Sequence, residues 1–196
     1  MNNLEIRALA RKQLKGNWLN PILASLSALG VAIVALIGLA ITPLAYIAIL
    51  IGCMPPIAFG IIMFYLNFVR GNNPAPTDVT KGFESWGKSI IALLLVGLYT
   101  ALWSMLFYIP GIVKSFSYSM TLYILNDNPD MTASEAIFQS QKMMFGHKSQ
   151  LFWLSLSFIG WYILASFTLG IGFIWLIPYM GISVTNFYES LKQEQV

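Results

Sequence analysis

Long apolar stretches separated by short polar segments dominate the chain. The longest apolar stretch runs from Gly16 to Val69 and contains no Asp, Glu, Lys, Arg or His. A helix that spans a membrane needs about 20 apolar residues, so this stretch is long enough for two crossings. We therefore predict an all-α, polytopic membrane helical bundle, with residues 1–196 forming a single integral membrane domain.

The apolar stretches predict six transmembrane helices arranged as three hairpins. Turn residues indicate tight connections at 108–111 and 168–172. Pro43 is expected to end or kink the first helix, and Pro55 and Pro56 to divide the second or to mark its start. The fourth helix is short for a full crossing. The predicted helices are 18–41, 46–68, 89–109, 112–126, 151–167 and 173–191.

A short amphipathic segment precedes each hairpin and is expected to lie as a helix at the membrane surface. Each segment ends in a glycine, at Gly16, Gly87 and Gly146. Thr132 and Glu135 have the spacing of a capping box and predict a helix over about 132–146. One repeated unit would explain this pattern; ordinary membrane hairpins with similarly placed Pro, Gly and Tyr are the alternative. The possible repeats are 1–70, 71–127 and 128–196.

The segment 3–15 carries three cations in a row at helical spacing, namely Arg7, Arg11 and Lys15. Such a row can face anionic lipid headgroups while the apolar face enters the membrane. The alternative is a solvated tail. An uncleaved first helix is favoured over a signal peptide, because the apolar stretch far exceeds the roughly 7–15 residues of a signal core.

The distribution of charge predicts the orientation. Only 10% of residues are charged, against about 25% in soluble domains. Of the 11 lysines and arginines, all except Lys114 fall in segments on one side of the predicted bundle. Short loops rich in Lys and Arg stay in the cytoplasm. We expect a multi-pass plasma-membrane protein with both termini cytoplasmic, and the small net charge of +3 gives no reason to expect nucleic acid as a partner.

Polar side chains inside the apolar stretches are the candidate binding residues. A charge inside a membrane segment is costly and usually functional or paired, which makes Lys114 the sharpest candidate. Alternatively, Lys114 reaches the outer headgroups, and the other polar residues only join helices. The predicted polar seam would bring together two groups, Lys114, Tyr118 and Thr121 with Tyr179, Ser183 and Asn186.

Residues for catalysis or metal binding are sparse. Cys53 is the only cysteine and His147 the only histidine. Asp127 and Asp130 are too few to hold a metal and are expected in a solvated loop. We predict no cofactor, no metal and no enzymatic activity.

Three stretches resemble a known family: 109–126 (IPGIVKSFSYSMTLYILN), 134–161 (SEAIFQSQKMMFGHKSQLFWLSLSFIGW) and 168–191 (TLGIGFIWLIPYMGISVTNFYESL). They resemble the bacterial integral membrane family catalogued as domain of unknown function 975. That family is distantly similar to membrane domains attached to some glycerophosphodiester phosphodiesterases. The resemblance implies a multi-helix plasma-membrane protein and transfers no catalytic residue.

These observations favour a non-enzymatic bacterial membrane protein that acts through contacts with membrane lipids, with itself or with a protein partner. The alternative is a small transporter or export accessory with a polar path near Lys114 and the last helix. A membrane enzyme that acts on lipid headgroups is the third hypothesis. It has no convergent polar constellation in its favour.

Overall fold

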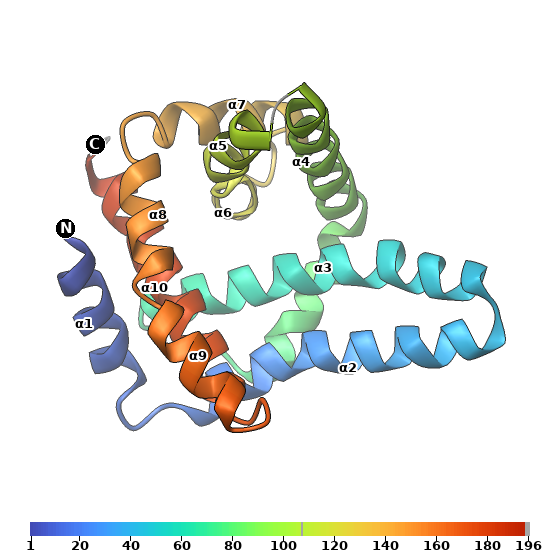
Figure 1. Cartoon of the computed structure of the whole chain (residues 1–196), viewed down its shortest axis with the longest axis horizontal. Helices are drawn as coiled ribbons and strands as arrows, with labels where there is room; N and C mark the ends of the chain where they lie inside the picture. The colour runs from blue at the N-terminus through green and yellow to red at the C-terminus, as the bar shows by residue number, and fades with distance from the viewer. Residues whose placement is uncertain (107, 195–196) are drawn as a thin grey trace.

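The computed structural model describes residues 1–106 and 108–194, and within these ranges every regular element is a helix. The predicted all-α class is confirmed. Figure 1 shows a hairpin of α2 and α3 that projects away from the other helices, and both termini on one side. The elements are α1 (Asn3–Leu14), α2 (Leu19–Ile41), α3 (Pro43–Val69), η1 (Pro76–Ser85), α4 (Trp86–Leu106), α5 (Tyr108–Tyr118), α6 (Thr121–Asp127), α7 (Ala133–Met143), α8 (Lys148–Leu156), α9 (Ile159–Phe167) and α10 (Phe173–Glu194).

Four stretches among the described residues are long and apolar enough to cross a membrane, which supports the membrane class. The six spans predicted from the sequence are not confirmed. At 1.5 Å per residue, the 11 residues of α5 cover only about 17 Å of an apolar layer roughly 30 Å thick. The second half of α10 is too polar to lie in the apolar layer of a membrane, since it carries Asn186, Glu189 and Lys192. The four stretches are Leu19–Leu39, Pro43–Val69, Pro76–Met105 and Lys148–Phe167.

The prolines of the first hairpin behave only partly as predicted. The first helix ends just before Pro43, as expected, since α2 stops at Ile41. Pro43 begins α3, where its missing N–H is not needed, and Thr42 Oγ1 caps this helix by accepting a hydrogen bond from the Ala45 N–H (3.1 Å). Pro55 and Pro56 lie buried inside α3, which continues unbroken to Val69. The expected division of this helix at its prolines is therefore wrong.

The backbones of α3 and η1 touch where two glycines face each other. A Cβ atom on Gly60 would collide with the carbonyl of Val79, and one on Gly82 would collide with the carbonyl of Pro56. η1 therefore lies directly on α3, next to its two internal prolines. Absent side chains at both positions are what permit this approach.

The second and third hairpins are interrupted by hydroxyl side chains. Residues 108–111, predicted as a turn, belong to α5, and Pro110 fits there because it lies in the first turn of the helix. The helix predicted over 112–126 is divided between α5 and α6, where Ser119 Oγ donates to the Phe116 carbonyl (2.8 Å). The expected helix 151–167 is likewise divided into α8 and α9, next to Ser157, whose Oγ donates to the Leu154 carbonyl (2.6 Å). Such bonds compete with the helical ladder.

The tight connection predicted at 168–172 is present between α9 and α10. Leu169 has φ 54° and Gly170 has φ 89°, so two successive residues adopt left-handed backbone geometry. Thr168 Oγ1 accepts a hydrogen bond from the Gly172 N–H (2.9 Å).

Two of the three predicted glycine joints have left-handed backbone geometry, Gly16 at φ 86° and Gly146 at φ 84°. Gly87 lies inside α4 instead. The helices α1, η1 and α7 nevertheless begin in the same way. In the first turn of each, a carboxylate accepts a hydrogen bond from the backbone N–H three residues earlier in the chain. Repetition of one unit stays a prediction.

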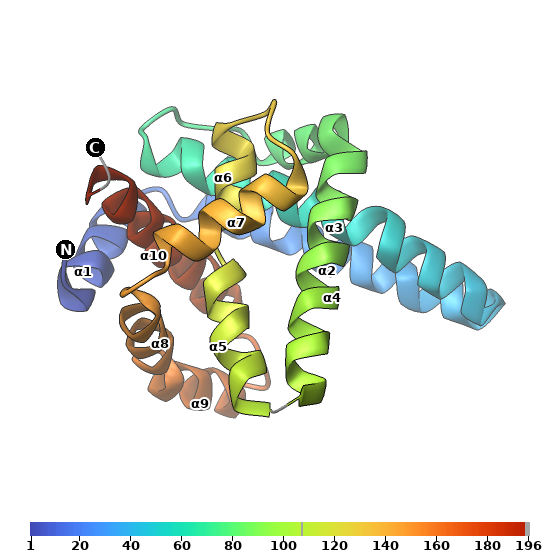
Figure 2. The same ribbon diagram turned by 90° about the horizontal axis from the view of Figure 1, so that it is seen from above.

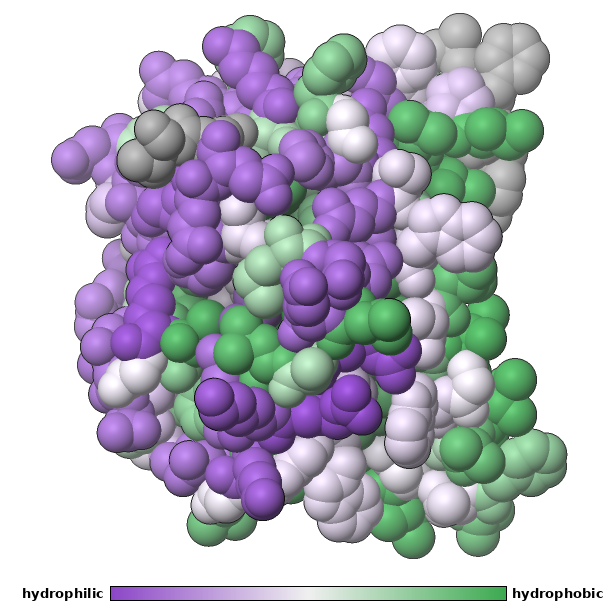
Figure 3. Space-filling model, turned by 90° about the vertical axis from the view of Figure 1, so that its left-hand side faces the viewer, coloured by the Kyte–Doolittle hydropathy of each residue, from purple (hydrophilic) through white to green (hydrophobic). Residues whose placement is uncertain are grey.

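Apolar and polar residues gather on different sides of the molecule. Figure 3 shows one side with hydrophilic residues to the left and hydrophobic residues along the right-hand edge. In Figure 2, α4, α5, α8 and α9 extend to the same side, away from α6 and α7. Large exposed apolar side chains are frequent on α2, α4 and α9, whereas the core lies where α3, α6 and α10 meet. Among its most deeply buried side chains are Phe64, Leu66, Ile124, Ile182, Phe187 and Tyr188.

Candidate functional site

Helix α1 packs on α10 and brings its cations to a groove beside it. Its start is fixed by a capping box, in which Asn2 Oδ1 accepts the Glu5 N–H (2.8 Å) and the Glu5 carboxylate accepts the Asn2 N–H (2.9 Å). Ile6, Ala10 and Leu14 are fully buried against the protein. The helix is therefore held by an apolar stripe along its length, and its cations lie to the side of that stripe.

Arg7 is anchored at the contact between α1 and α10. Its Nε lies 3.4 Å from the hydroxyl oxygen of Tyr179, and its guanidinium lies 5.1 Å from the centroid of the Phe158 ring. The rings of Phe158 and Tyr179 meet edge to face at 5.2 Å. A cation over an aromatic face is attracted by the electron density of the ring. The contacts with Phe158 and Tyr179 therefore hold the Arg7 side chain between α1 and α10.

One turn further along α1, Arg11 borders an apolar groove. The groove has a volume of about 450 Å³, and Arg11 is its only charged lining residue. Three tryptophans contribute to its wall, from the start of the first hairpin and from both sides of the third. Lys15, the last cation of the predicted row, is exposed one turn beyond Arg11 and does not line the groove. The aromatic wall consists of Trp18, Trp161, Trp175 and Tyr179.

Two of the three polar residues predicted on the last helix, Tyr179 and Asn186, contact α1. Asn186, which is 2% exposed, donates from Nδ2 to Gln13 Oε1 (2.8 Å). Ser183 Oγ donates to the carbonyl of Tyr179 within α10 (2.8 Å). Gln13 Nε2 in turn donates to the carbonyl of Val69 (3.5 Å), which joins α1, α3 and α10.

The other predicted polar residues lie elsewhere. Lys114 Nζ donates to Gln141 Oε1 on α7 (3.4 Å) and lies 4.8 Å from the centroid of the Trp103 ring. Tyr118 packs near Tyr99, with ring centroids 6.3 Å apart, and Thr121 Oγ1 donates to the carbonyl of Tyr118 (2.7 Å). No hydrogen bond between described residues joins this group to the polar residues of α10, so the predicted seam is two separate sites.

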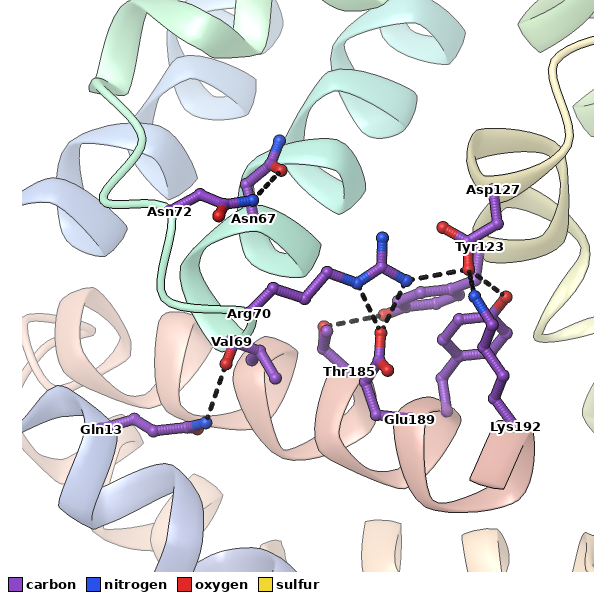
Figure 4. A network of polar contacts seen from close by, with 11 residues as sticks. Gln13, Asn67, Val69, Arg70, Asn72, Tyr123, Asp127, Thr185, Glu189 and Lys192 are labelled. Carbon is purple, nitrogen blue, oxygen red and sulfur yellow. Dashed lines mark hydrogen bonds and ion pairs between the residues drawn. The ribbon is translucent and has the colours of Figure 1, made fainter. Parts of the chain in front are cut away.

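A cluster of charged residues that the sequence did not predict joins α3, α6 and α10 (Figure 4). Arg70 extends from the end of α3 between Asp127 (2.8 Å) and Glu189 (2.7 Å). The Asp127 carboxylate also accepts hydrogen bonds from Lys192 Nζ (2.6 Å) and the Tyr188 hydroxyl (3.0 Å). Asp127 is therefore not in a solvated loop, since its side chain is only 7% exposed.

Charged donors hold the Asp127 carboxylate in its ionised form. Burial by itself would raise its pKa, but the hydrogen bonds from Arg70, Lys192 and Tyr188 and the attraction of Arg70 outweigh it. The pKa of Asp127 is therefore lowered from its ordinary value. The available sequence signal was position, because Arg70 and Asp127 each lie at the end of an apolar helix, where a charge can face another helix end.

Comparison with known proteins matches the chain to a protein family. No curated protein and no solved structure matches the chain significantly. The family profile matches residues 1–114 and 108–195, which together cover almost the whole sequence. The chain therefore belongs to the family described as "Protein of unknown function (DUF975)".

Proposed function

We propose that this protein is a non-enzymatic component of the bacterial plasma membrane that binds an anionic lipid in the groove between α1, α9 and α10. The observation that carries the proposal is the composition of that groove, an apolar and tryptophan-rich hollow of about 450 Å³ with one arginine at its edge. This combination matches a molecule with an apolar chain and a negatively charged head.

Each part of the groove has a counterpart in a phospholipid. Acyl chains gain from leaving water for the apolar wall, which includes Leu164 and Leu176. Tryptophan rings favour the boundary between lipid chains and headgroups. The guanidinium of Arg11 can hold a phosphate with two parallel hydrogen bonds. Arg7 lies one turn away with its guanidinium fixed over Phe158, and it adds a second positive charge to the region.

The proposal includes an even number of membrane crossings with both termini in the cytoplasm. It is supported by the ion pair between the amino group of Met1 and Glu194 (3.7 Å), which requires both ends on one side. It is also supported by Lys114, whose ammonium group contacts Gln141 on α7, one of the segments expected in the cytoplasm. Every lysine and arginine then belongs to the cytoplasmic side, as short-loop charge rules favour. Association with a protein partner or a second copy stays a prediction.

Lipid binding can be tested by native mass spectrometry of the purified, delipidated protein. Added phosphatidylglycerol should form stoichiometric adducts, and phosphatidylcholine should bind more weakly. The change Arg11→Gln should weaken the phosphatidylglycerol adduct about fivefold, the factor that corresponds to roughly 1 kcal/mol for one cation near an anionic surface. Trp161→Ala should also weaken it, without any change in charge.

The matched control is Lys12→Gln, which removes the same charge from the adjacent position of α1. Lys12 is exposed and does not line the groove. If Lys12→Gln weakens the adduct as much as Arg11→Gln does, the protein attracts anionic lipid only through its overall charge. The bound lipid should be recovered chemically intact, and a cleaved headgroup would contradict the non-enzymatic part of the proposal.

A further inference from the structure

A second hollow, separate from the groove at Arg11, is bordered by three lysines from different helices. It has a volume of about 450 Å³ and shares no lining residue with the Arg11 groove. Lys114 comes from α5, Lys142 from α7, and Lys148 is the first residue of α8. Gln141 and Phe145 complete its lining.

No carboxylate among the described residues forms an ion pair with these lysines. Lys114 contacts only neutral groups, the Gln141 amide and the Trp103 ring. Lys142 lies 4.5 Å from the centroid of the Phe138 ring. Three ammonium groups around one hollow repel one another, and in the described part of the chain no acid compensates them.

The acidic residues nearby have other partners. Glu194 lies 3.7 Å from both the Met1 amino group and His147 Nε2. Glu135 accepts hydrogen bonds from the backbone N–H and the hydroxyl of Thr132. Asp127 belongs to the cluster with Arg70 and Lys192. The hollow therefore keeps a concentrated positive potential that a bound anion would neutralise.

The start of α8 adds to this potential. The helix begins at Lys148, and the His147 side chain at the capping position makes no hydrogen bond to the first turn. The free N–H groups at a helix start carry a partial positive charge and favour an anion. This second feature is independent of the lysine side chains, and it also lies at the border of the hollow.

We infer that this hollow binds a phosphate group through Lys114, Lys142 and Lys148. Exposed aromatic rings on α7 and just after it favour the phosphate of a lipid headgroup, since Phe138 is 58% and Phe145 is 82% exposed. Aromatic rings and lysines placed side by side are typical of the boundary between lipid and water. A free phosphate ion has the same chemistry and is the other possible source.

The test uses the double variant Lys114→Gln, Lys142→Gln in the full-length protein. Phosphatidic acid is added to the delipidated protein and adducts are measured by native mass spectrometry, while inorganic phosphate is titrated by calorimetry. Loss of two cations should weaken binding about 25-fold, at about fivefold for each. If phosphatidic acid binds and inorganic phosphate does not, the ligand is a headgroup; lysine-dependent binding of both probes indicates that the phosphate group alone suffices.

Two further variants separate a specific site from general charge and from misfolding. The control Lys12→Gln, Lys88→Gln removes the same charge from two positions that do not line the hollow and should leave binding unchanged. The variant Lys114→Arg, Lys142→Arg should restore binding, because it restores both charges. Equal losses in the Gln variant and the control, failure of both probes to bind, or failure of the Arg variant to restore binding would overturn the inference. Arg11→Gln should not alter phosphate binding at the hollow, because Arg11 does not line it. The phosphate site and the proposed lipid groove can therefore be refuted separately.

Discussion

Replacing Asp127 by Asn should destabilise the fold by about 2 kcal/mol. The carboxylate accepts hydrogen bonds from Arg70, Lys192 and Tyr188 while its side chain is only 7% exposed. A hydrogen bond to a charged group contributes about 1.5–3 kcal/mol. We take the lower part of this range, because the side chains of Arg70 and Lys192 are 32% and 46% exposed and water screens them.

The effect of pH on the same site follows from the lowered pKa of Asp127. A carboxylate whose pKa is lower in the folded state stabilises the fold at pH values above its unfolded pKa, about 3.8. This stabilisation is lost as the pH falls through the lower, folded-state pKa. The wild type should therefore lose stability below about pH 4, and the Asp127→Asn variant should lack this component.

Thermal unfolding in detergent, followed by intrinsic tryptophan fluorescence at pH 7 and at pH 3, measures both effects. For a chain of this size, 2 kcal/mol corresponds to a decrease in Tm of about 4 to 8 °C. Asp130→Asn is the control, because Asp130 is exposed three residues away and has no ion-pair partner among the described residues. An equal decrease in Tm for Asp130→Asn, or unchanged acid sensitivity in Asp127→Asn, would refute the role assigned to the carboxylate.

Three other predictions concern helix contacts and topology. Gly60→Ala should lower the free energy of unfolding, measured by denaturant titration, by about 3 kcal/mol, because the added Cβ would collide with the Val79 carbonyl. Gly52→Ala is the control and should be nearly neutral, because Gly52 lies at an open position. Thr132→Ala should reduce stability by about 1 kcal/mol in thermal unfolding, because the start of α7 loses the hydroxyl that accepts the Glu135 N–H (3.3 Å). A reporter that is active only in the cytoplasm should be active when it is fused to either terminus. An extracytoplasmic location of one terminus would contradict the even number of crossings.

The helical class was predictable because it depends on local properties of the sequence. Uncharged length predicts apolar helices, and the capping box at Thr132 and Glu135 is present as expected. The prolines were harder, because proline is compatible both with a break and with the first turn of a helix. Pro43 and Pro110 both occupy the first turn, whereas Pro55 and Pro56 are tolerated inside α3 beside η1.

The candidate sites could be predicted only in part, because periodicity gives the face of a helix and not its neighbour. The polar face of α10 was recognised from Tyr179 and Asn186, but its partner is α1 and not α5. Lys114 was recognised as exceptional, and its association with Lys142 and Lys148 depends on how α5, α7 and α8 pack. The groove at Arg11 likewise combines residues more than 150 positions apart, such as Trp18 and Trp175.

The contact of α1 with α10 has a consequence for biosynthesis. The residues that hold Arg7 and Gln13 in place, Tyr179 and Asn186, belong to the last helix. On a ribosome, α1 is made long before α10, the helix with which it has its main contact. The groove at Arg11 forms only once α9 and α10 exist, so lipid binding there would report that the last helix has been made and has docked on α1.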